Sequence, residues 1–201
     1  MTYHRLKQNT MASLIEIVGK SNLSTKEEDL RDYSIDESAL PQSHAPDAIV
    51  KPINTRMVSQ ILSFAHINRI PVTPRGGGTG VSGGCVPQFG GIVLSLEAMN
   101  HVLKIDSCNF LAIVEPGVTL TKLNEEVLTH NLYYPIHIGE MTATLGGSIS
   151  TNAGGMNAVK YGVTRHHVLG LEAVLPTGEI LYKAQKHMQP IKYAALCVGC
   201  W

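Results

Sequence analysis

The sequence predicts a fold of the α/β or α+β class, and three observations predict it. Short apolar runs of strand length alternate with segments whose apolar residues recur at helical spacing, and no internal repeat is present. The 201 residues are 44% hydrophobic and 16% charged, as is typical of a globular protein with its own core. Most of the 19 glycines gather in two segments, which we interpret as long connections in a compact body.

The first 40 residues are polar and of mixed charge. One short amphipathic helix is expected over residues 14–18, closed by Gly19. The run from residue 26 to 37 is expected to be mostly a solvated acidic stretch.

The next part of the chain carries two strand signals and a helix between them. A strand is expected over residues 48–51, and Asn54 is placed to cap a following helix whose apolar positions span residues 57–65. A second short strand, residues 70–73, leads directly into the first glycine-rich segment.

Beyond that segment the sequence again interleaves strands with a helix. The expected elements are strands at 92–96 and 111–114, a helix capped by Thr119 with its apolar face on Leu120, Leu123, Val127 and Leu128, and a hairpin formed by strands 168–175 and 180–182 around Pro176, Thr177 and Gly178.

Charge and cysteine content exclude several classes of protein. Sixteen basic residues balance sixteen acidic ones, and a pI of about 7.1 gives no electrostatic footprint for nucleic acid or an anionic membrane. Two uncharged runs, 76–96 and 141–159, are too rich in Gly, Ser, Thr and Asn for membrane-spanning helices, so we expect loops and turns there. Four cysteines and no secretory leader indicate a reducing, cytoplasmic compartment without disulfides.

The glycines themselves point to a ligand. Eight lie between Gly76 and Gly91 and six between Gly139 and Gly162. Glycine inside a regular element costs about 0.5–1 kcal/mol relative to alanine, so such clusters need a compensating use, either positive φ or close approach of the backbone. Backbone amides wrapped around an anionic ligand are one such use.

One reading of the first cluster is a dinucleotide-binding fingerprint. Gly78, Gly80 and Gly83 match the spacing G-x-G-x-x-G after a strand. That fingerprint requires a helix to open at its third glycine, whereas Pro87 and two more glycines follow here, and no Walker lysine is present. A nicotinamide-binding Rossmann unit and a merely flexible loop therefore remain as less favoured alternatives.

Four segments, taken in order, resemble the flavin-binding domain of the vanillyl-alcohol oxidase and para-cresol methylhydroxylase (PCMH-type) family. They are Pro71 to Gly84 (PVTPRGGGTGVSGG), Val114 to Val118 (VEPGV), Thr142 to Gly155 (TATLGGSISTNAGG) and Lys160 to Val163 (KYGV). Within that family the sequence is most similar to FAD-linked D-lactate dehydrogenases and the D subunit of glycolate oxidase.

The resemblance implies an α+β, PCMH-type FAD-binding fold of two α/β subdomains. It assigns residues 41–182 to the FAD-binding domain, after an N-terminal helical segment, 1–40, and before a divergent tail, 183–201. The family continues with a Gly-Ser-Glu-Gly element and a substrate domain that this sequence lacks, so we expect a C-terminally incomplete, truncated form.

The resemblance also implies which residues contact FAD. The first loop would surround the pyrophosphate with backbone amides, and the second would follow the ribityl chain and isoalloxazine ring. The expected cofactor-binding residues are Arg75, Gly76, Gly77, Gly78, Thr79, Gly80, Ser82, Gly83, Gly84, Met141, Thr142, Thr144, Gly146, Gly147, Ser148, Thr151, Asn152, Ala153, Gly154, Gly155, Gly162 and Val163. An ordinary turn role stays open for Asn152.

One position departs from part of the family. Members that attach FAD covalently through this loop carry a histidine after the glycine triplet, where Thr79 stands here. Non-covalent FAD is therefore expected.

Other chemistry-bearing residues are assigned no catalytic role. His166 and His167 are adjacent on an expected strand, so at most one would face a ligand, and His137 is interpreted as structural. Cys197 and Cys200 form a C-x-x-C pair, but a structural zinc site needs four ligands and no second pair exists. No metal is expected.

The resemblance implies a flavin-dependent oxidoreductase that takes hydride from a D-2-hydroxy acid such as D-lactate or glycolate, with transfer to flavin N5. A quinone or cytochrome at the membrane would accept the electrons, so a cytoplasmic protein with peripheral membrane contact is expected. The alternative is a non-catalytic FAD-binding remnant without a substrate domain.

Overall fold

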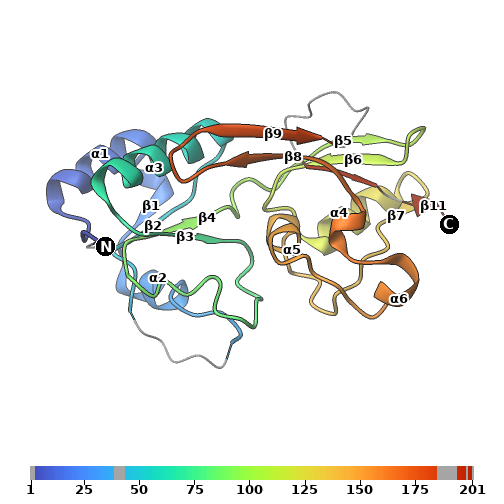
Figure 1. The fold of residues 1–201 in the computed structure, drawn as a ribbon, viewed down its shortest axis with the longest axis horizontal. Helices are drawn as coiled ribbons and strands as arrows, with labels where there is room; N and C mark the ends of the chain where they lie inside the picture. The colour runs from blue at the N-terminus through green and yellow to red at the C-terminus, as the bar shows by residue number, and fades with distance from the viewer. Residues whose placement is uncertain (1–2, 39–43, 185–193, 198, 201) are drawn as a thin grey trace. The chain divides into compact units, whose positions relative to one another are not determined.

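The structure is a computed structural model that describes residues 3–38, 44–184, 194–197 and 199–200 (Figure 1). It divides into two compact units. The first comprises Met1–Ala98 with Val174–Ile180, and the second Met99–Ala173 with Leu181–Trp201. Both units contain helices and strands, which confirms the predicted mixed fold.

A four-stranded sheet forms the centre of the first unit. Its order is β1 (Leu23–Ser24), β2 (Ala48–Val50), β4 (Ile92–Ser95) and β3 (Val72–Arg75). The last three strands are parallel, whereas β1 is antiparallel to β2. Every residue of β2 and β4 is buried, as expected for parallel strands with both faces covered.

Three helices cover this sheet. Helices α1 (Gln8–Val18) and α3 (Thr55–Asn68) lie on one side and α2 (Glu27–Asp32) on the other, and the 3-10 turn η1 (Lys20–Asn22) follows α1 (Figure 1). The predicted cap of α3 is confirmed, since the side chain of Asn54 accepts a hydrogen bond from the amide of Met57 at 2.9 Å.

The second unit is built on a five-stranded sheet with the order β5–β6–β10–β8–β9. The bounds of these strands are Val102–Asp106 for β5, Leu111–Val114 for β6, Ala194–Cys197 for β10, Val168–Val174 for β8 and Ile180–Ala184 for β9. Strand β10 is antiparallel to both β6 and β8. The tail beyond residue 183 thus supplies a central strand of this sheet.

Helix α4 (Leu120–Leu128) anchors the hydrophobic core of the second unit. Thr119 caps it as predicted, accepting a hydrogen bond from the amide of Lys122 at 3.2 Å. Leu120, Leu123 and Val127 are fully buried. The remaining elements are β7 (Leu132–Tyr133), paired with β11 (Gly199–Cys200), the short helices α5 (Leu145–Thr151) and α6 (Ala158–Tyr161), and the 3-10 turn η2 (Thr164–His166).

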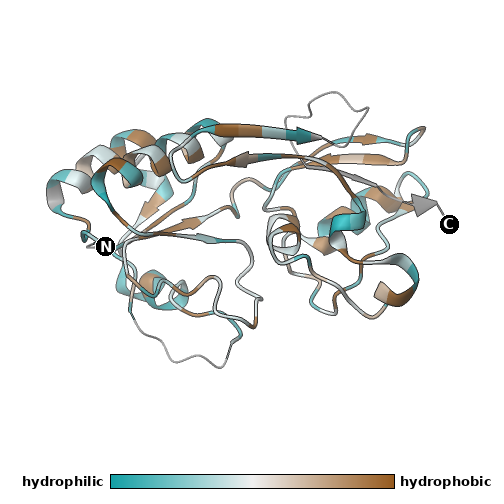
Figure 2. Cartoon of the chain, viewed as in Figure 1, coloured by the Kyte–Doolittle hydropathy of each residue, from teal (hydrophilic) through white to brown (hydrophobic). Residues whose placement is uncertain are grey.

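The run 26–37 is mostly exposed, as expected, and it contains helix α2, which Figure 2 shows as mostly hydrophilic. Ser34, just after this helix, is completely buried. Two local expectations are wrong. The second uncharged run is not all loop, because α5 forms inside it. His166 ends η2 and lies outside β8, so the two adjacent histidines do not share a strand.

Among the described residues, no helix is both long enough and apolar enough to span a bilayer. Nor does any group of three or more His, Cys, Asp or Glu side chains in the described ranges form a metal-binding cluster. The side chains of Cys197 and Cys200 lie outside the described structure, so the C-x-x-C interpretation stays a prediction.

Candidate ligand-binding loops

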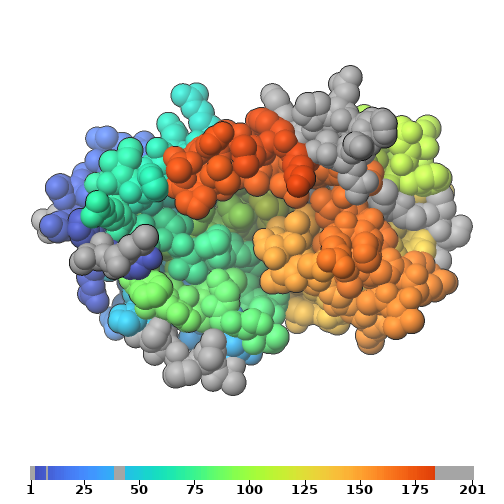
Figure 3. Space-filling view, viewed as in Figure 1, coloured from blue at the N-terminus to red at the C-terminus, as the bar shows by residue number. Residues whose placement is uncertain are grey.

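The first glycine-rich loop connects the parallel neighbours β3 and β4, from residue 76 to residue 91. It therefore leaves the carboxyl end of a parallel strand, which is the usual place for a ligand in an open α/β sheet. Gly78 and Gly83 adopt φ of +74° and +75°, a left-handed conformation that side chains other than glycine rarely adopt. Much of this loop is exposed at the surface of the first unit (green in Figure 3).

Several backbone amides of this loop are available for a ligand. Within the described part of the chain, the amides of Gly77, Thr79, Val81, Ser82 and Gly84 have no hydrogen-bond acceptor. A run of unpaired amides in a loop with left-handed residues is a typical anion-binding arrangement. Ser82 is exposed beside them and adds a hydroxyl donor.

The glycines of this loop are of two kinds. A Cβ on Gly78 would lie 2.1 Å from Nη2 of Arg75, so this glycine makes room for a side chain of the protein itself. A Cβ on Gly84 would meet nothing within 4 Å, and one on Gly80 only an oxygen of Asp36 at 3.9 Å. Protein packing therefore explains Gly78 but leaves the other two glycines free for close approach of a ligand.

The side chain of Arg75 is engaged inside the protein. Its Nη1 donates to the carbonyl of Ile35 at 2.6 Å, and its guanidinium lies 5.1 Å from the ring centroid of Tyr33. This arginine supports the loop from the protein side, in addition to the backbone contact with FAD that the resemblance implies.

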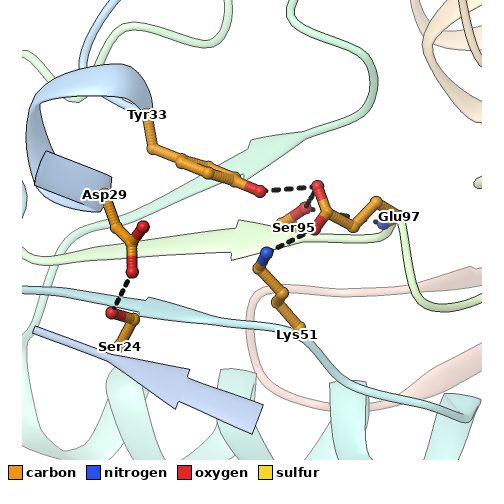
Figure 4. Close-up of polar contacts among 6 residues, drawn as sticks. All are labelled: Ser24, Asp29, Tyr33, Lys51, Ser95 and Glu97. Carbon is orange, nitrogen blue, oxygen red and sulfur yellow. Dashed lines mark hydrogen bonds and ion pairs between the residues drawn. The ribbon is translucent and has the colours of Figure 1, made fainter. Parts of the chain in front are cut away.

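A polar cluster lies near the ends of β2 and β4, beneath the same tyrosine (Figure 4). The Tyr33 hydroxyl donates to Oε2 of Glu97 at 2.6 Å, Ser95 donates to the same oxygen at 3.1 Å, and Lys51 pairs with Oε1. Burial opposes ionisation of Glu97, but the hydrogen bonds from Lys51 and Tyr33 outweigh it and lower the pKa of the carboxyl. Burial lowers and Glu97 raises the pKa of Lys51, with a net increase.

The second glycine-rich segment lies in the second unit and is organised around α5. Thr144 caps the helix by accepting from the amide of Gly147 at 3.3 Å. The hydroxyls of Ser148 and Thr151 donate to carbonyls one turn earlier, at 3.0 Å each. Several of the short polar side chains expected near FAD therefore satisfy their hydrogen bonds within the helix.

The ends of α5 are also fixed by local contacts. Thr142 donates its hydroxyl to Glu140 at 2.5 Å. Asn152 closes the helix in the left-handed region, with φ of +50°, and its Oδ1 accepts from the amide of Arg165 at 3.1 Å. The turn role left open for Asn152 is thus observed, and a contact with cofactor stays a prediction.

Close packing explains most glycines of the second segment. A Cβ on Gly155 would lie 1.8 Å from the carbonyl oxygen of His137, and one on Gly146 would lie 2.8–2.9 Å from Pro116. A Cβ on Gly162 would lie 2.3 Å from Nδ1 of His166, and one on Gly154 would lie 3.0 Å from Val163. Gly155 and Gly146 let backbone segments of the unit approach one another, whereas Gly162 and Gly154 make room for side chains.

The expected backbone contacts of Met141 and Ala153 are used by the protein as well. The carbonyl of Met141 accepts from the amide and hydroxyl of Thr121, both at 3.0 Å. The carbonyl of Ala153 accepts from the amide of Thr164 at 3.0 Å and from its hydroxyl at 2.7 Å. Around this segment, Met156 and Val159 are strongly exposed.

The histidines near the second segment have structural partners. Nδ1 of His166 accepts from the amide of Val163 at 3.2 Å, and Nε2 of His167 lies 2.9 Å from the carbonyl of Tyr161. His137 contacts the sulfur of Met141 at 3.1 Å. Burial of the nearby Tyr134 raises its pKa to about 12. Each of these three histidines thus has a partner within the protein.

The structure thus groups the predicted residues into two sets. Those from 75 to 84 share one loop of the first unit, and those from 141 to 163 share one segment of the second. Sequence reasoning missed Asp36, whose Oδ2 would lie 3.9 Å from a Cβ on Gly80, because a carboxylate in a polar acidic run carries no signal of its own.

Comparison with known proteins shows which sequences and structures this chain is similar to. Residues 46–182 match the family model described as "FAD binding domain". The chain is 49% identical over 152 residues to a D-lactate dehydrogenase of Archaeoglobus fulgidus, covering 74% of this chain and 34% of that one. It is 39% identical over 177 residues to the glycolate oxidase subunit GlcD of Bacillus subtilis, covering 88% of this chain and 37% of that one.

Solved structures show the same fold. A crystal structure of p-cresol methylhydroxylase with substrate bound superposes with a TM-score of 0.81 at 19% identity, over 97% of this chain and 44% of that one. The predicted PCMH-type fold is therefore confirmed. The chain spans only about a third of the length of the two curated relatives.

Proposed function

The chain belongs to the family of FAD binding domains, and on that premise we propose that it is the FAD-binding part of a flavin-dependent oxidoreductase acting on a D-2-hydroxy acid of the D-lactate or glycolate type. Its sequence similarity to a D-lactate dehydrogenase and to a glycolate oxidase subunit supports this substrate class. Bound FAD supplies the hydride acceptor, its N5 atom. Residues 41–182 form the FAD-binding domain in this proposal.

The observation that best supports pyrophosphate binding is the set of unpaired backbone amides in the first loop. Gly77, Thr79, Val81, Ser82 and Gly84 offer N–H donors that no acceptor in the described structure uses. Because Gly80 and Gly84 have room for a Cβ that the sequence omits, the loop fits a ligand that approaches the main chain closely. A pyrophosphate is such a ligand, since its oxygens accept from several amides at once.

In the second segment, we propose that the exposed side of α5 and its ends hold the rest of FAD. Thr142 and Thr151 are exposed there, and both hydroxyl oxygens retain lone pairs after donating to the protein. The left-handed conformation of Asn152 and the packing of Gly155 against His137 fix the backbone of this segment. The predicted residues from Met141 to Val163 are kept in this role.

We further propose that FAD is held without a covalent bond through the first loop. Thr79 has no nitrogen nucleophile to offer at the position where covalent members carry histidine. Acid precipitation of the purified protein should then leave all yellow colour in the supernatant. Flavin fluorescence on the denatured polypeptide would contradict the proposal.

Purification followed by an absorbance spectrum tests the cofactor, and reduction of an artificial dye by D-lactate or glycolate tests the reaction. We expect a flavin spectrum, and Cys108→Ser should retain it, because this exposed thiol is not among the residues assigned to FAD. A colourless protein that does not bind added FAD in calorimetry would refute the proposed function. Bound FAD without dye reduction would favour the non-catalytic alternative.

A quinone or cytochrome at the membrane is the proposed electron acceptor.

A further inference from the structure

The side chain of Arg75 is folded back into the first turn of the first glycine-rich loop. The backbone of Arg75 is fixed at the end of β3, where its carbonyl accepts from the amide of Leu96 at 3.0 Å. A Cβ on Gly78 would lie 2.1 Å from Nη2, 2.6 Å from Cζ and 3.2 Å from Nε of Arg75, so this glycine packs directly against the guanidinium group. Because Gly78 also has a φ of +74°, the turn from residue 75 to residue 78 closes around the protein's own arginine.

Two groups from a segment outside the loop hold this guanidinium. Nη1 donates to the carbonyl of Ile35 at 2.6 Å, and Cζ lies 5.1 Å from the centroid of the Tyr33 ring. At that distance an arginine is attracted to the π electrons of an aromatic ring. Both partners of Arg75 lie before residue 46, where the match to the family model begins.

Tyr33 is itself fixed by the polar cluster of Figure 4. Its hydroxyl donates to Oε2 of Glu97 at 2.6 Å, and the hydroxyl of Ser95 donates to the same oxygen at 3.1 Å. Lys51 pairs with the other oxygen of Glu97, and its Nζ lies 5.1 Å from the centroid of the Tyr33 ring. The tyrosine is therefore held both at its hydroxyl and at its ring.

These contacts connect the edge of the parallel sheet to the loop. Lys51 directly follows β2, and Arg75 is the last residue of β3, so both lie at the carboxyl edge where open α/β sheets bind ligands. The amides of Gly77 and Thr79, on either side of Gly78, have no acceptor in the described structure. A shift of the Arg75 side chain would therefore release Gly78 and move the two unpaired amides beside it.

We propose that Tyr33 is a positioning residue for FAD binding, because its ring holds Arg75 in the place around which the first turn of the loop closes. The inference rests on the proposed function, since it assumes that FAD binds this loop. With the turn already closed, the amides beside Gly78 are in place before FAD arrives, and binding costs less entropy. Glycine-rich chains have the most conformational entropy to lose, so they gain most from such support.

Two simpler roles make different predictions. If Tyr33 only stabilised the first unit, Tyr33→Leu would lower the melting temperature and leave the Kd of the folded protein for FAD unchanged. If Arg75 acted only as a positive charge near the pyrophosphate, Arg75→Lys would bind FAD like wild type, because lysine keeps the charge. A positioning role requires the planar guanidinium, which contacts the ring and donates to Ile35, so Arg75→Lys should weaken binding.

The main test is a double-mutant cycle on the full chain, measured by calorimetric titration with FAD. Tyr33→Leu and Arg75→Lys should each raise the Kd about three- to tenfold. The double variant should have the Kd of the weaker-binding single variant, because two substitutions that remove the same contact are not additive. Fold-changes that multiply in the double variant would overturn the inference, since Tyr33 would then act independently of Arg75.

The matched control is Tyr33→Phe, which keeps the ring beside Arg75 and removes only the hydroxyl that donates to Glu97. We expect its Kd to stay within about twofold of wild type, although its melting temperature should fall by about 2–4 °C. A Kd as high as that of Tyr33→Leu would overturn the inference, because the ring would then not be the contact that matters. If Tyr33→Leu does not fold, Arg75→Lys carries the test, and a wild-type Kd for it overturns the inference.

A measurement without FAD distinguishes this inference from the proposed function. NMR relaxation dispersion of the FAD-free protein detects motion on the microsecond-to-millisecond timescale. We expect more such motion at the amides of residues 76–80 in Tyr33→Leu than in wild type or Tyr33→Phe, with strand β4 as the internal control. Unchanged loop amides would overturn the positioning role. Increased loop motion in a chain whose wild type does not bind FAD would support the contact between Tyr33 and the loop and refute FAD as the ligand.

Discussion

Replacing Gly84 by alanine tests whether the first loop omits side chains for the sake of a ligand. A Cβ at this position meets no protein atom within 4 Å, and the residue does not adopt positive φ. The substitution should therefore change the free energy of unfolding by less than about 1 kcal/mol, with a small gain from the reduced entropy of the unfolded chain. Its effect should appear in FAD binding instead.

The magnitude follows from the bond that the methyl group blocks. The unpaired amide of Gly84 is one of the donors assigned to the pyrophosphate, and a hydrogen bond to a charged group contributes about 1.5–3 kcal/mol. Since about 1.4 kcal/mol corresponds to a tenfold change in affinity, the Kd for FAD should rise roughly 10- to 150-fold. Calorimetric titration of the FAD-free protein measures this change directly.

Gly78→Ala, in the same loop, is the contrasting variant. Here φ is +74° and the new Cβ would lie 2.1 Å from Arg75, so we expect a loss of about 1–2 kcal/mol in the free energy of unfolding without any FAD present. Thermal unfolding of both FAD-free variants separates the two cases. If Gly84→Ala bound FAD like wild type, or destabilised the chain as much as Gly78→Ala, the assignment of the loop's open side to FAD would be wrong.

Three further predictions concern stability. Glu97→Gln should lower the free energy of unfolding by about 1 kcal/mol after solvent screening of the half-exposed pair with Lys51. Folding lowers the pKa of the Glu97 carboxyl below its ordinary value of 4.5. The stabilisation by ionised Glu97 is therefore present above pH 4.5 and is lost as the pH falls through the folded-state pKa. Melting curves of wild type and variant should converge in acid. Leu123→Ala should cost about 2–5 kcal/mol in urea unfolding, since the side chain is completely buried in the second core. Asn152→Gly should keep the left-handed turn and lose only the bond to Arg165, so its cost should stay near 1 kcal/mol, whereas Asn152→Ala should cost more.

The sequence predicts elements well where local chemistry and burial agree. Helix α3 begins after Asn54 because its side chain caps the first turn, and its buried positions Val58, Ile61 and Ala65 recur at helical spacing. Strand β2 and the first three residues of β4 are short apolar runs, as expected for parallel strands with two covered faces. In these cases a single stretch of sequence contains the whole signal.

Elements that depend on distant partners could not be predicted in the same way. Helix α2 has only one apolar residue, Leu30, and its position is fixed by the bond between Ser24 and Asp29 and by Tyr33. Helix α5 carries two glycines, and it packs against Pro116 because Gly146 has no Cβ.

The same reason limits prediction of the candidate site. The glycine pattern indicated two segments with close approach or unusual backbone conformation, but it did not separate Gly84, which faces open space, from Gly155, which faces His137. Nor did it reveal that the carbonyl of Ile35 holds the side chain of Arg75, because that contact joins residues 40 positions apart. The spacing of residues along the chain predicts local conformation, but it does not predict which distant residues come into contact.

The tip of the β8–β9 hairpin has a consequence for how the chain folds as it is made. Residues 174–180 belong to the first unit, where Gly178 accepts a hydrogen bond at 2.6 Å from Ser59, 119 positions earlier, and packs against the backbone of α3. At about 5–20 residues per second, the ribosome needs roughly 6–24 s to travel between those two residues. During that interval the first unit lacks residues 174–180, so it cannot complete its fold until Met99–Ala173 of the second unit has been synthesised.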